Sequence, residues 1–166
     1  MIEAIKLQIQ ILKLQLQKAL LDEKVTIPNL GNPTKIIVHH GGGWMDFEGV
    51  NEYHKQKWGF KSSLGFYIGY TYFIDRSGTI HQGRRDNEEG AHTKGFNQRT
   101  IGICMMGNGE EKDFTMPQYQ ALEGLILKKC KEYGIPKDDI YGHQNFAATL
   151  CPSTILYKWL LKIKVA

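Results

Sequence analysis

The stretch KIIVHHGGG, residues 35–43, places a short apolar run directly before two histidines and three glycines. Residues 35–40 are rich in β-branched side chains, which predicts a buried strand. The glycines end that strand, because a residue without Cβ lets the backbone turn and approach a ligand closely. The sequence therefore predicts imidazoles at a strand end, a place that often carries binding groups. A single histidine there is more commonly structural than a ligand.

Strand and helix signals alternate through the chain that follows. Asp46 is placed to cap a helix, and Thr115 opens a capping box with proline in the first turn. The turn sequence DRSG, residues 75–78, separates two strand-like runs and predicts a hairpin. The expected elements are a helix over 46–58, hairpin strands over 66–74 and 79–83, a strand over 100–106, a helix over 115–133 and a helix from 153. Strands interleaved with helices predict an α/β fold with a central mixed β-sheet flanked by helices.

Residues 1–25 differ from the rest, since Ile, Leu, Gln and Lys dominate them. Their apolar positions follow the spacing 3, 4, 3, 4, 3 of a heptad seam: Ile2, Ile5, Ile9, Leu12, Leu16 and Ala19. Residues 5–11 also alternate as a strand would, but good helix formers and the length of the segment favour a helix. We expect an amphipathic N-terminal helix over 1–25, a connector over 26–34 and a folded domain over 35–166. The helix either packs on its own domain, pairs with a second copy or binds a partner.

Length and composition limit the classes of protein. The 166 residues, 42% hydrophobic and 23% charged, suffice for one domain. A net charge of +4 argues against a disordered polyelectrolyte and against a dedicated nucleic-acid binder, so no nucleic-acid partner is expected. No apolar run approaches the roughly 20 residues of a membrane span. No signal peptide is visible, so we expect synthesis in the cytoplasm.

A second group of metal-binding side chains lies near the C-terminus. His143 precedes Cys151 by eight positions in a polar loop. Alone, Cys151 is better explained as a small buried hydrophobe. With a strand-end histidine, however, the two make a three-ligand set that suits tetrahedral zinc with its fourth position open, as in catalytic sites. The sequence HExxH is absent, which excludes a thermolysin-like helix site.

Four stretches in a fixed order carry a family resemblance: 36–40; 68–75 with 78–80 and 83–84; 90–97 with 101–103; and 142–152. Through them, the chain from Lys35 to Trp159 resembles the zinc-dependent type-2 N-acetylmuramoyl-L-alanine amidases. Small phage amidase lysozymes and the peptidoglycan recognition proteins share this family. The resemblance implies the same mixed sheet; it does not cover the segment 1–25, which we expect as an extra N-terminal helix.

The resemblance also implies roles for individual residues. Zn²⁺ would be held by three side chains, His39, His143 and Cys151. Tyr70 would orient the attacking water and Thr149 would contact the oxyanion. Without the metal motif, the first would be better explained as a packed aromatic residue and the second as a loop hydroxyl bonded to backbone. The residues expected near the substrate are His40, Arg84, His92 and Asn97, with the arginine opposite a stem-peptide carboxylate.

The implied activity is zinc-dependent hydrolysis of the amide bond between N-acetylmuramic acid and L-alanine in bacterial peptidoglycan. We expect a phage or prophage endolysin that acts on the cell wall after release. The alternatives are a non-catalytic peptidoglycan-recognition module, against which Cys151 argues, and an interaction protein with structural zinc. Gln144 and Asn145 stand where relatives often have Arg-Asp, and Gly41 stands where they have Thr or Ser. The missing aspartate removes a carboxylate that could orient a ligand imidazole.

Overall fold

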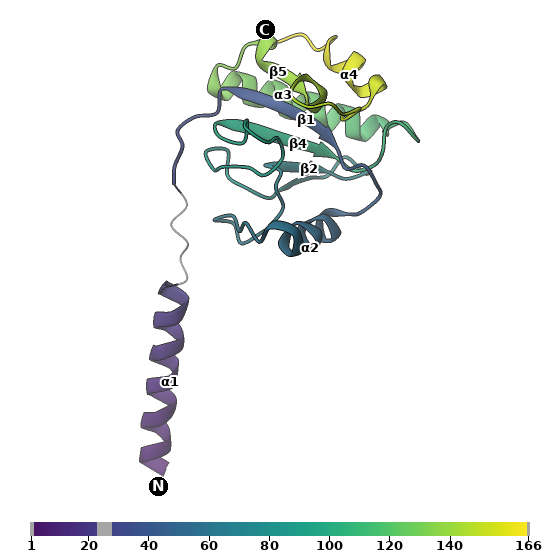
Figure 1. Cartoon of the computed structure of the whole chain (residues 1–166). Helices are drawn as coiled ribbons and strands as arrows, with labels where there is room; N and C mark the ends of the chain where they lie inside the picture. The colour runs from purple at the N-terminus through teal and green to yellow at the C-terminus, as the bar shows by residue number, and fades with distance from the viewer. Residues whose placement is uncertain (1, 23–27, 166) are drawn as a thin grey trace.

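The computed structural model describes residues 2–22 and 28–165; residue 1 of the expected N-terminal helix and the junction 23–27 with its connector lie outside them. A five-stranded sheet lies between helices (Figure 1). Its strands are β1 (Lys35–His40), β2 (Tyr72–Ile74), β3 (Ile80–Gln82), β4 (Thr100–Met105) and β5 (Ile140–Gly142), in the order β3-β2-β4-β1-β5. Strands β2, β4, β1 and β5 are parallel, and β3 is antiparallel to β2. The expected mixed sheet is confirmed.

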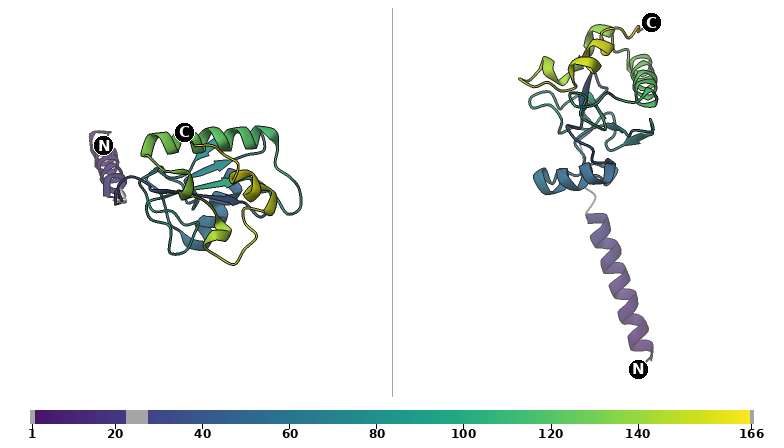
Figure 2. Two further views of the ribbon diagram at one scale, coloured as in Figure 1. Left: turned by 90° about the horizontal axis from the view of Figure 1, so that it is seen from above. Right: turned by 90° about the vertical axis from the view of Figure 1, so that its right-hand side faces the viewer.

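Helices cover both faces of the sheet. They are α2 (Phe47–Trp58) on one face and α3 (Met116–Tyr133) with α4 (Thr154–Leu160) on the other, as Figures 1 and 2 show. The expected start signals are present: Asp46 accepts a hydrogen bond from the Gly49 N–H, and Thr115 forms the capping box with Gln118. Two short 3-10 turns, Lys137–Asp139 and His143–Asn145, flank β5.

Alternation along the strands divides the core between these two faces. Ile36 and Val38 of β1 join the larger cluster, which packs under α3 and α4. Phe73 and Cys104 join the smaller cluster, which packs under α2. By the same alternation, His39 points to the α2 side of the sheet. The first histidine of the pair is thus directed to one face by the pleat alone.

The hairpin is confirmed, but its first strand is shorter than the expected 66–74. The N–H groups of residues 67–69 bond to side chains instead of a sheet neighbour: Asn51 accepts from those of Tyr67 and Ile68, and His54 accepts from that of Gly69. Polar groups on α2 therefore replace the ladder here, and the regular strand β2 begins only at Tyr72.

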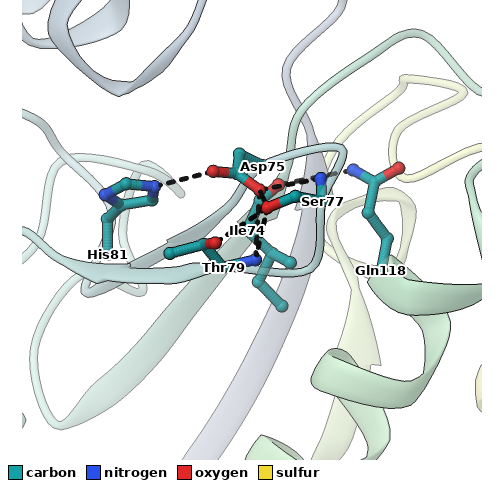
Figure 3. Close-up of polar contacts among 6 residues, drawn as sticks. All are labelled: Ile74, Asp75, Ser77, Thr79, His81 and Gln118. Carbon is teal, nitrogen blue, oxygen red and sulfur yellow. Dashed lines mark hydrogen bonds and ion pairs between the residues drawn. The ribbon is translucent and has the colours of Figure 1, made fainter.

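The turn of the hairpin is organised by Asp75. One carboxylate oxygen accepts from the backbone N–H groups of Ser77 and Thr79, and the other lies 3.1 Å from Nε2 of His81 (Figure 3). Burial raises the pKa of Asp75, but these hydrogen bonds outweigh it and hold the pKa below its usual value. Gln118 of α3 reaches the Ile74 carbonyl, which ties the hairpin to the helix layer.

Helix α1 (Ile2–Asp22) forms over most of the expected N-terminal segment and extends away from the sheet in Figures 1 and 2. Ile5, Leu7, Ile9, Ile11, Leu12 and Leu14 are all exposed. No helix among the described residues is both long and apolar enough to cross a membrane.

Candidate metal and active site

The three predicted ligands lie together at the carboxyl end of β1. His39 is the fifth residue of that strand, and His143 follows β5, which pairs with β1 in parallel so that Val38 lies opposite Gly142. Cys151 comes back to the same edge at the end of the loop. The candidate ligand atoms of the three residues all lie within 4.8 Å of one another. The carboxyl ends of parallel strands thus form the site, as is usual in α/β sheets.

Backbone contacts hold Cys151 beside the strand end. The His40 N–H points to the Cys151 sulfur at 3.3 Å, and the Cys151 carbonyl accepts from the Gln144 N–H at 2.8 Å. The sulfur is 3.8 Å from Nδ1 of His39, whose ring centroid is 4.6 Å from that of His143. The Cys151 sulfur and Nδ1 of His39 are therefore close enough to bind one metal ion.

The protonation states of these groups suit a soft divalent metal. Burial, with neighbouring histidines, holds the pKa of His39 well below its usual value, and burial also lowers that of His143. Both imidazoles are neutral at pH 7 and offer a lone pair. Burial raises the pKa of the Cys151 thiol to about 12, so this ligand would lose its proton on binding a metal. Two neutral imidazoles and one thiol are a donor set typical of zinc.

His92 and Thr93 support the far side of the His39 ring. Nε2 of His39 lies 3.1 Å from Nδ1 of His92 and 3.4 Å from Oγ1 of Thr93. The His92 ring fits there because two neighbours are glycine: a Cβ at Gly90 or Gly102 would lie 2.5 Å from its Cδ2 atom. A polar partner on the second nitrogen fixes the orientation and tautomer of a ligand imidazole. These two contacts therefore orient the His39 imidazole.

Tyr70 lies beside the three candidate ligands on the α2 side. Its ring centroid is 5.2 Å from that of His39, and burial raises its pKa well above the usual value, so its hydroxyl is a proton donor at neutral pH. The thiol of Cys104 is in contact with this hydroxyl. The preceding peptide is fixed on both sides: the Gly69 N–H donates to Nδ1 of His54, and its carbonyl accepts from the Ala91 N–H.

Thr149 lies two residues before Cys151, on the loop that closes the site. Its hydroxyl accepts a hydrogen bond from the Cys151 N–H at 3.2 Å. The local backbone bond considered from the sequence is therefore present. It uses an oxygen lone pair, however, so the hydroxyl proton can still be donated to another group.

A cavity of about 660 Å³ adjoins the candidate ligands. It is lined by His143, by residues 89–95 and 97 of one loop, by Trp58 at the end of helix α2 and by Phe60 just after it. His92 and Asn97, two of the residues predicted to lie near the substrate, both line it. The Asn97 side-chain oxygen also accepts from the N–H groups of His92 and Thr93, so it shapes the loop. His40 is not among the lining residues, and its Nδ1 accepts from the Gly109 N–H.

The partners of Arg84 differ from the stem-peptide carboxylate that the sequence leads us to expect. Its side chain is 0% exposed, and its guanidinium donates to the backbone carbonyls of Ile68, Glu89 and Phe60. The Phe60 ring also covers the guanidinium at 4.4 Å. The Arg84 guanidinium therefore joins three backbone segments around the cavity. Because it is buried, it is not exposed to a stem-peptide carboxylate in the cavity.

Sequence reasoning missed His54, Thr93 and the aromatic pair Trp58 and Phe60. For His54 a signal existed: Phe47, Val50 and His54 are spaced 3 and 4, so they share the buried face of α2. For Thr93 the signal was its position directly after His92, within the stretch 90–97 that carries the family resemblance. The aromatic pair had no signal, because only the fold brings the end of α2 to the cavity.

Comparison with known proteins agrees with this geometry. A family model described as N-acetylmuramoyl-L-alanine amidase matches residues 29–154. The chain is 35% identical over 98 residues to the endolysin of Enterobacteria phage K11. That alignment covers 56% of this chain and 64% of the endolysin, which is less than two thirds of the relative's length.

Solved structures show the same fold. The N-acetylmuramoyl-L-alanine amidase LysC from Clostridium intestinale URNW matches at a TM-score of 0.71 and 32% identity, over 85% of this chain and 93% of LysC. The peptidoglycan recognition protein PGRP-SA of Apis mellifera also matches at a TM-score of 0.71, with 26% identity, over 84% of this chain and 87% of that one. The chain is therefore similar both to endolysin amidases and to recognition proteins.

Proposed function

Because the chain belongs to the N-acetylmuramoyl-L-alanine amidase family, we propose that it hydrolyses the amide bond between N-acetylmuramic acid and L-alanine in bacterial peptidoglycan, as a phage or prophage endolysin. The observation that carries the proposal is the meeting of His39, His143 and Cys151 beside a cavity, with Tyr70 next to them. In this proposal residues 35–166 are the catalytic domain, and the enzyme acts on the wall after release.

Zinc is the metal that this donor set fits best, and when bound it would act as a Lewis acid that activates water and polarises an amide carbonyl. The chain's own residues would do the rest. His92 and Thr93 hold the His39 ring through its Nε2 atom. Tyr70 keeps its proton at neutral pH and would orient the attacking water by a hydrogen bond. The Thr149 hydroxyl would donate to the developing oxyanion, a contribution of about 2.7–4 kcal/mol in other enzymes.

The cavity would hold the substrate around the scissile bond. Trp58 and Phe60 are 48% and 36% exposed and offer apolar surface for a sugar or a methyl group. Lys94 and Glu89 on the opposite loop offer charges of both signs to the stem peptide. Asn97 would keep this loop in place through its backbone contacts.

The second candidate is a recognition module that binds peptidoglycan without cutting it, and the similarity to PGRP-SA favours keeping it. The complete set of three ligand side chains favours the enzyme, because binding alone needs no metal-activated water.

A wall-digestion assay separates the two. Zinc-loaded protein is incubated with purified peptidoglycan, and new N-terminal alanine is measured by amino-group labelling, alongside the amount of protein bound to the wall. We expect release by the wild type and none by Cys151→Ser. Cys130→Ser is the matched control, because that buried cysteine lies in α3. Binding to the wall without any release of alanine would refute the proposed amidase activity and favour the recognition module.

A further inference from the structure

Helix α1 exposes an apolar stripe that no part of the described chain covers. Ile5, Ile9 and Leu12 lie on one side of the helix and are 55%, 48% and 58% exposed. In the sequence, Ile2, Leu16 and Ala19 continue the same spacing over three heptads. A helix of this length in water is stabilised mainly by packing such a face against another element. The regular 3.5-residue repeat is typical of a coiled coil, in which the covering element is another helix.

The residues beside the stripe indicate which helix covers it. With position a at Ile9 and position d at Ile5 and Leu12, Lys13 occupies e and Gln8 occupies g. In a parallel pair of identical helices, e of one helix lies beside g of the other, so lysine meets neutral glutamine. In an antiparallel pair, e lies beside e and lysine meets lysine, which is unfavourable. The pattern is thus compatible with a parallel association of copies of this same helix.

We propose that α1 joins two or more copies of this chain side by side through a parallel coiled coil centred on Ile5, Ile9 and Leu12. Ile9 at a with Leu12 at d is the combination typical of two strands, whereas isoleucine at both positions, as at Ile2 and Ile5, is typical of three or four. Each copy then contributes one domain to the assembly. If the proposed function holds, several catalytic domains act from one particle on a polymeric wall, which raises the effective concentration of each domain once the first has bound.

The oligomeric state of the full chain tests the proposal and needs no activity. Sedimentation equilibrium at tens of micromolar protein compares the wild type with Leu12→Glu and Leu14→Glu. The two leucines are a matched pair: they are 58% and 60% exposed, but Leu14 lies off the stripe on the other side of the helix. We expect a wild-type mass of at least two chains, the mass of one chain for Leu12→Glu, and the wild-type mass for Leu14→Glu. A monomeric wild type overturns the proposal, and so does equal dissociation by the two substitutions.

Disulfide trapping tests the parallel orientation. In a parallel assembly the Ile5 side chains of neighbouring helices are adjacent, whereas in an antiparallel one residue 5 lies near residue 16 of the neighbour. Mild oxidation of Ile5→Cys should therefore give a covalent dimer within the assembly. The wild type is the background control, since Cys104, Cys130 and Cys151 are all buried. An assembly of Ile5→Cys that forms no covalent dimer would refute the parallel arrangement.

Discussion

Replacement of Arg84 by methionine distinguishes the role seen in the structure from the one expected from the sequence. The substitution keeps an apolar stem of similar length and removes every donor. The three carbonyls that the guanidinium now satisfies, those of Ile68, Glu89 and Phe60, would lose their partner. Hydrogen bonds to a charged group contribute about 1.5–3 kcal/mol each.

Two effects make the expected loss of stability smaller than the summed contributions of these three hydrogen bonds. Burial of the guanidinium is itself unfavourable, which is why the pKa of Arg84 is lowered to about 10. The carbonyls of Glu89 and Phe60 are only partly buried and can recover water. We therefore expect Arg84→Met to lower the free energy of unfolding by about 3–5 kcal/mol, at the low end of the summed contributions of the three bonds. For a domain of this size, that corresponds to roughly 10–15 °C in Tm.

Urea and thermal unfolding measure this loss, and Arg85→Met is the control. Arg85 is the adjacent residue and is exposed, so its substitution should change stability by less than about 0.5 kcal/mol. Where enough Arg84→Met protein stays folded at low temperature, KM for soluble wall fragments should remain close to the wild-type value. A variant that is as stable as the wild type but has a strongly raised KM would show that the guanidinium binds substrate and that our interpretation of its contacts is wrong.

Three further predictions concern the site itself. Tyr70→Phe and Thr149→Val should each lower kcat by roughly 10²-fold in the zinc-loaded enzyme with little change in Tm, and turnover within threefold of wild type would exclude the proposed role of that hydroxyl. Zinc binding to metal-free protein at pH 7 should release about one proton, because the Cys151 thiol has its pKa raised to about 12; calorimetry in two buffers of different ionisation enthalpy measures this, and no release would contradict thiolate ligation. Burial lowers the pKa of His54 to about 4 in the folded chain, whereas the unfolded chain binds this proton at the usual pKa near 6.5. As the pH falls from 6.5 to 4, the free energy of unfolding should therefore decrease, by no more than about 3 kcal/mol from this group. His54→Asn retains an acceptor for the Gly69 N–H and should flatten that fall, and an unchanged pH dependence would refute the assignment.

Sequence patterns predicted those elements whose signals are local. The caps at Asp46 and Thr115 and the turn at residues 75–78 lie within a few residues of the groups they bind, so their identity was readable from the chain. Strand β5 was not predicted, because three residues carry no periodicity and this strand exists only through its parallel pairing with β1. The boundary of β2 was missed for a related reason, since Asn51 and His54 act from a helix distant in the sequence.

The same distinction explains which site residues could be foreseen. His39 follows from its place at a strand end, and His143 with Cys151 from their loop, so candidate ligands are visible in sequence. The side chains that position these ligands and Tyr70 are polar and buried. Residue type alone does not show whether an arginine or a histidine is buried, so these roles could not be predicted.

Two of these buried side chains, Arg84 and His54, act on adjacent peptide groups, the Ile68 carbonyl and the Gly69 N–H, immediately before Tyr70. The backbone there has no ladder neighbour at Gly69 other than the loop at Ala91. Loss of either side chain would therefore free the segment that positions the tyrosine, while the three ligand side chains, on β1 and on the 143–151 loop, would keep their own contacts. Substitutions at these two positions should consequently reduce kcat and stability together and leave zinc affinity nearly unchanged. Titration of each metal-free variant with zinc measures that affinity, and a tenfold weaker affinity would mean that the tyrosine segment and the metal site are coupled.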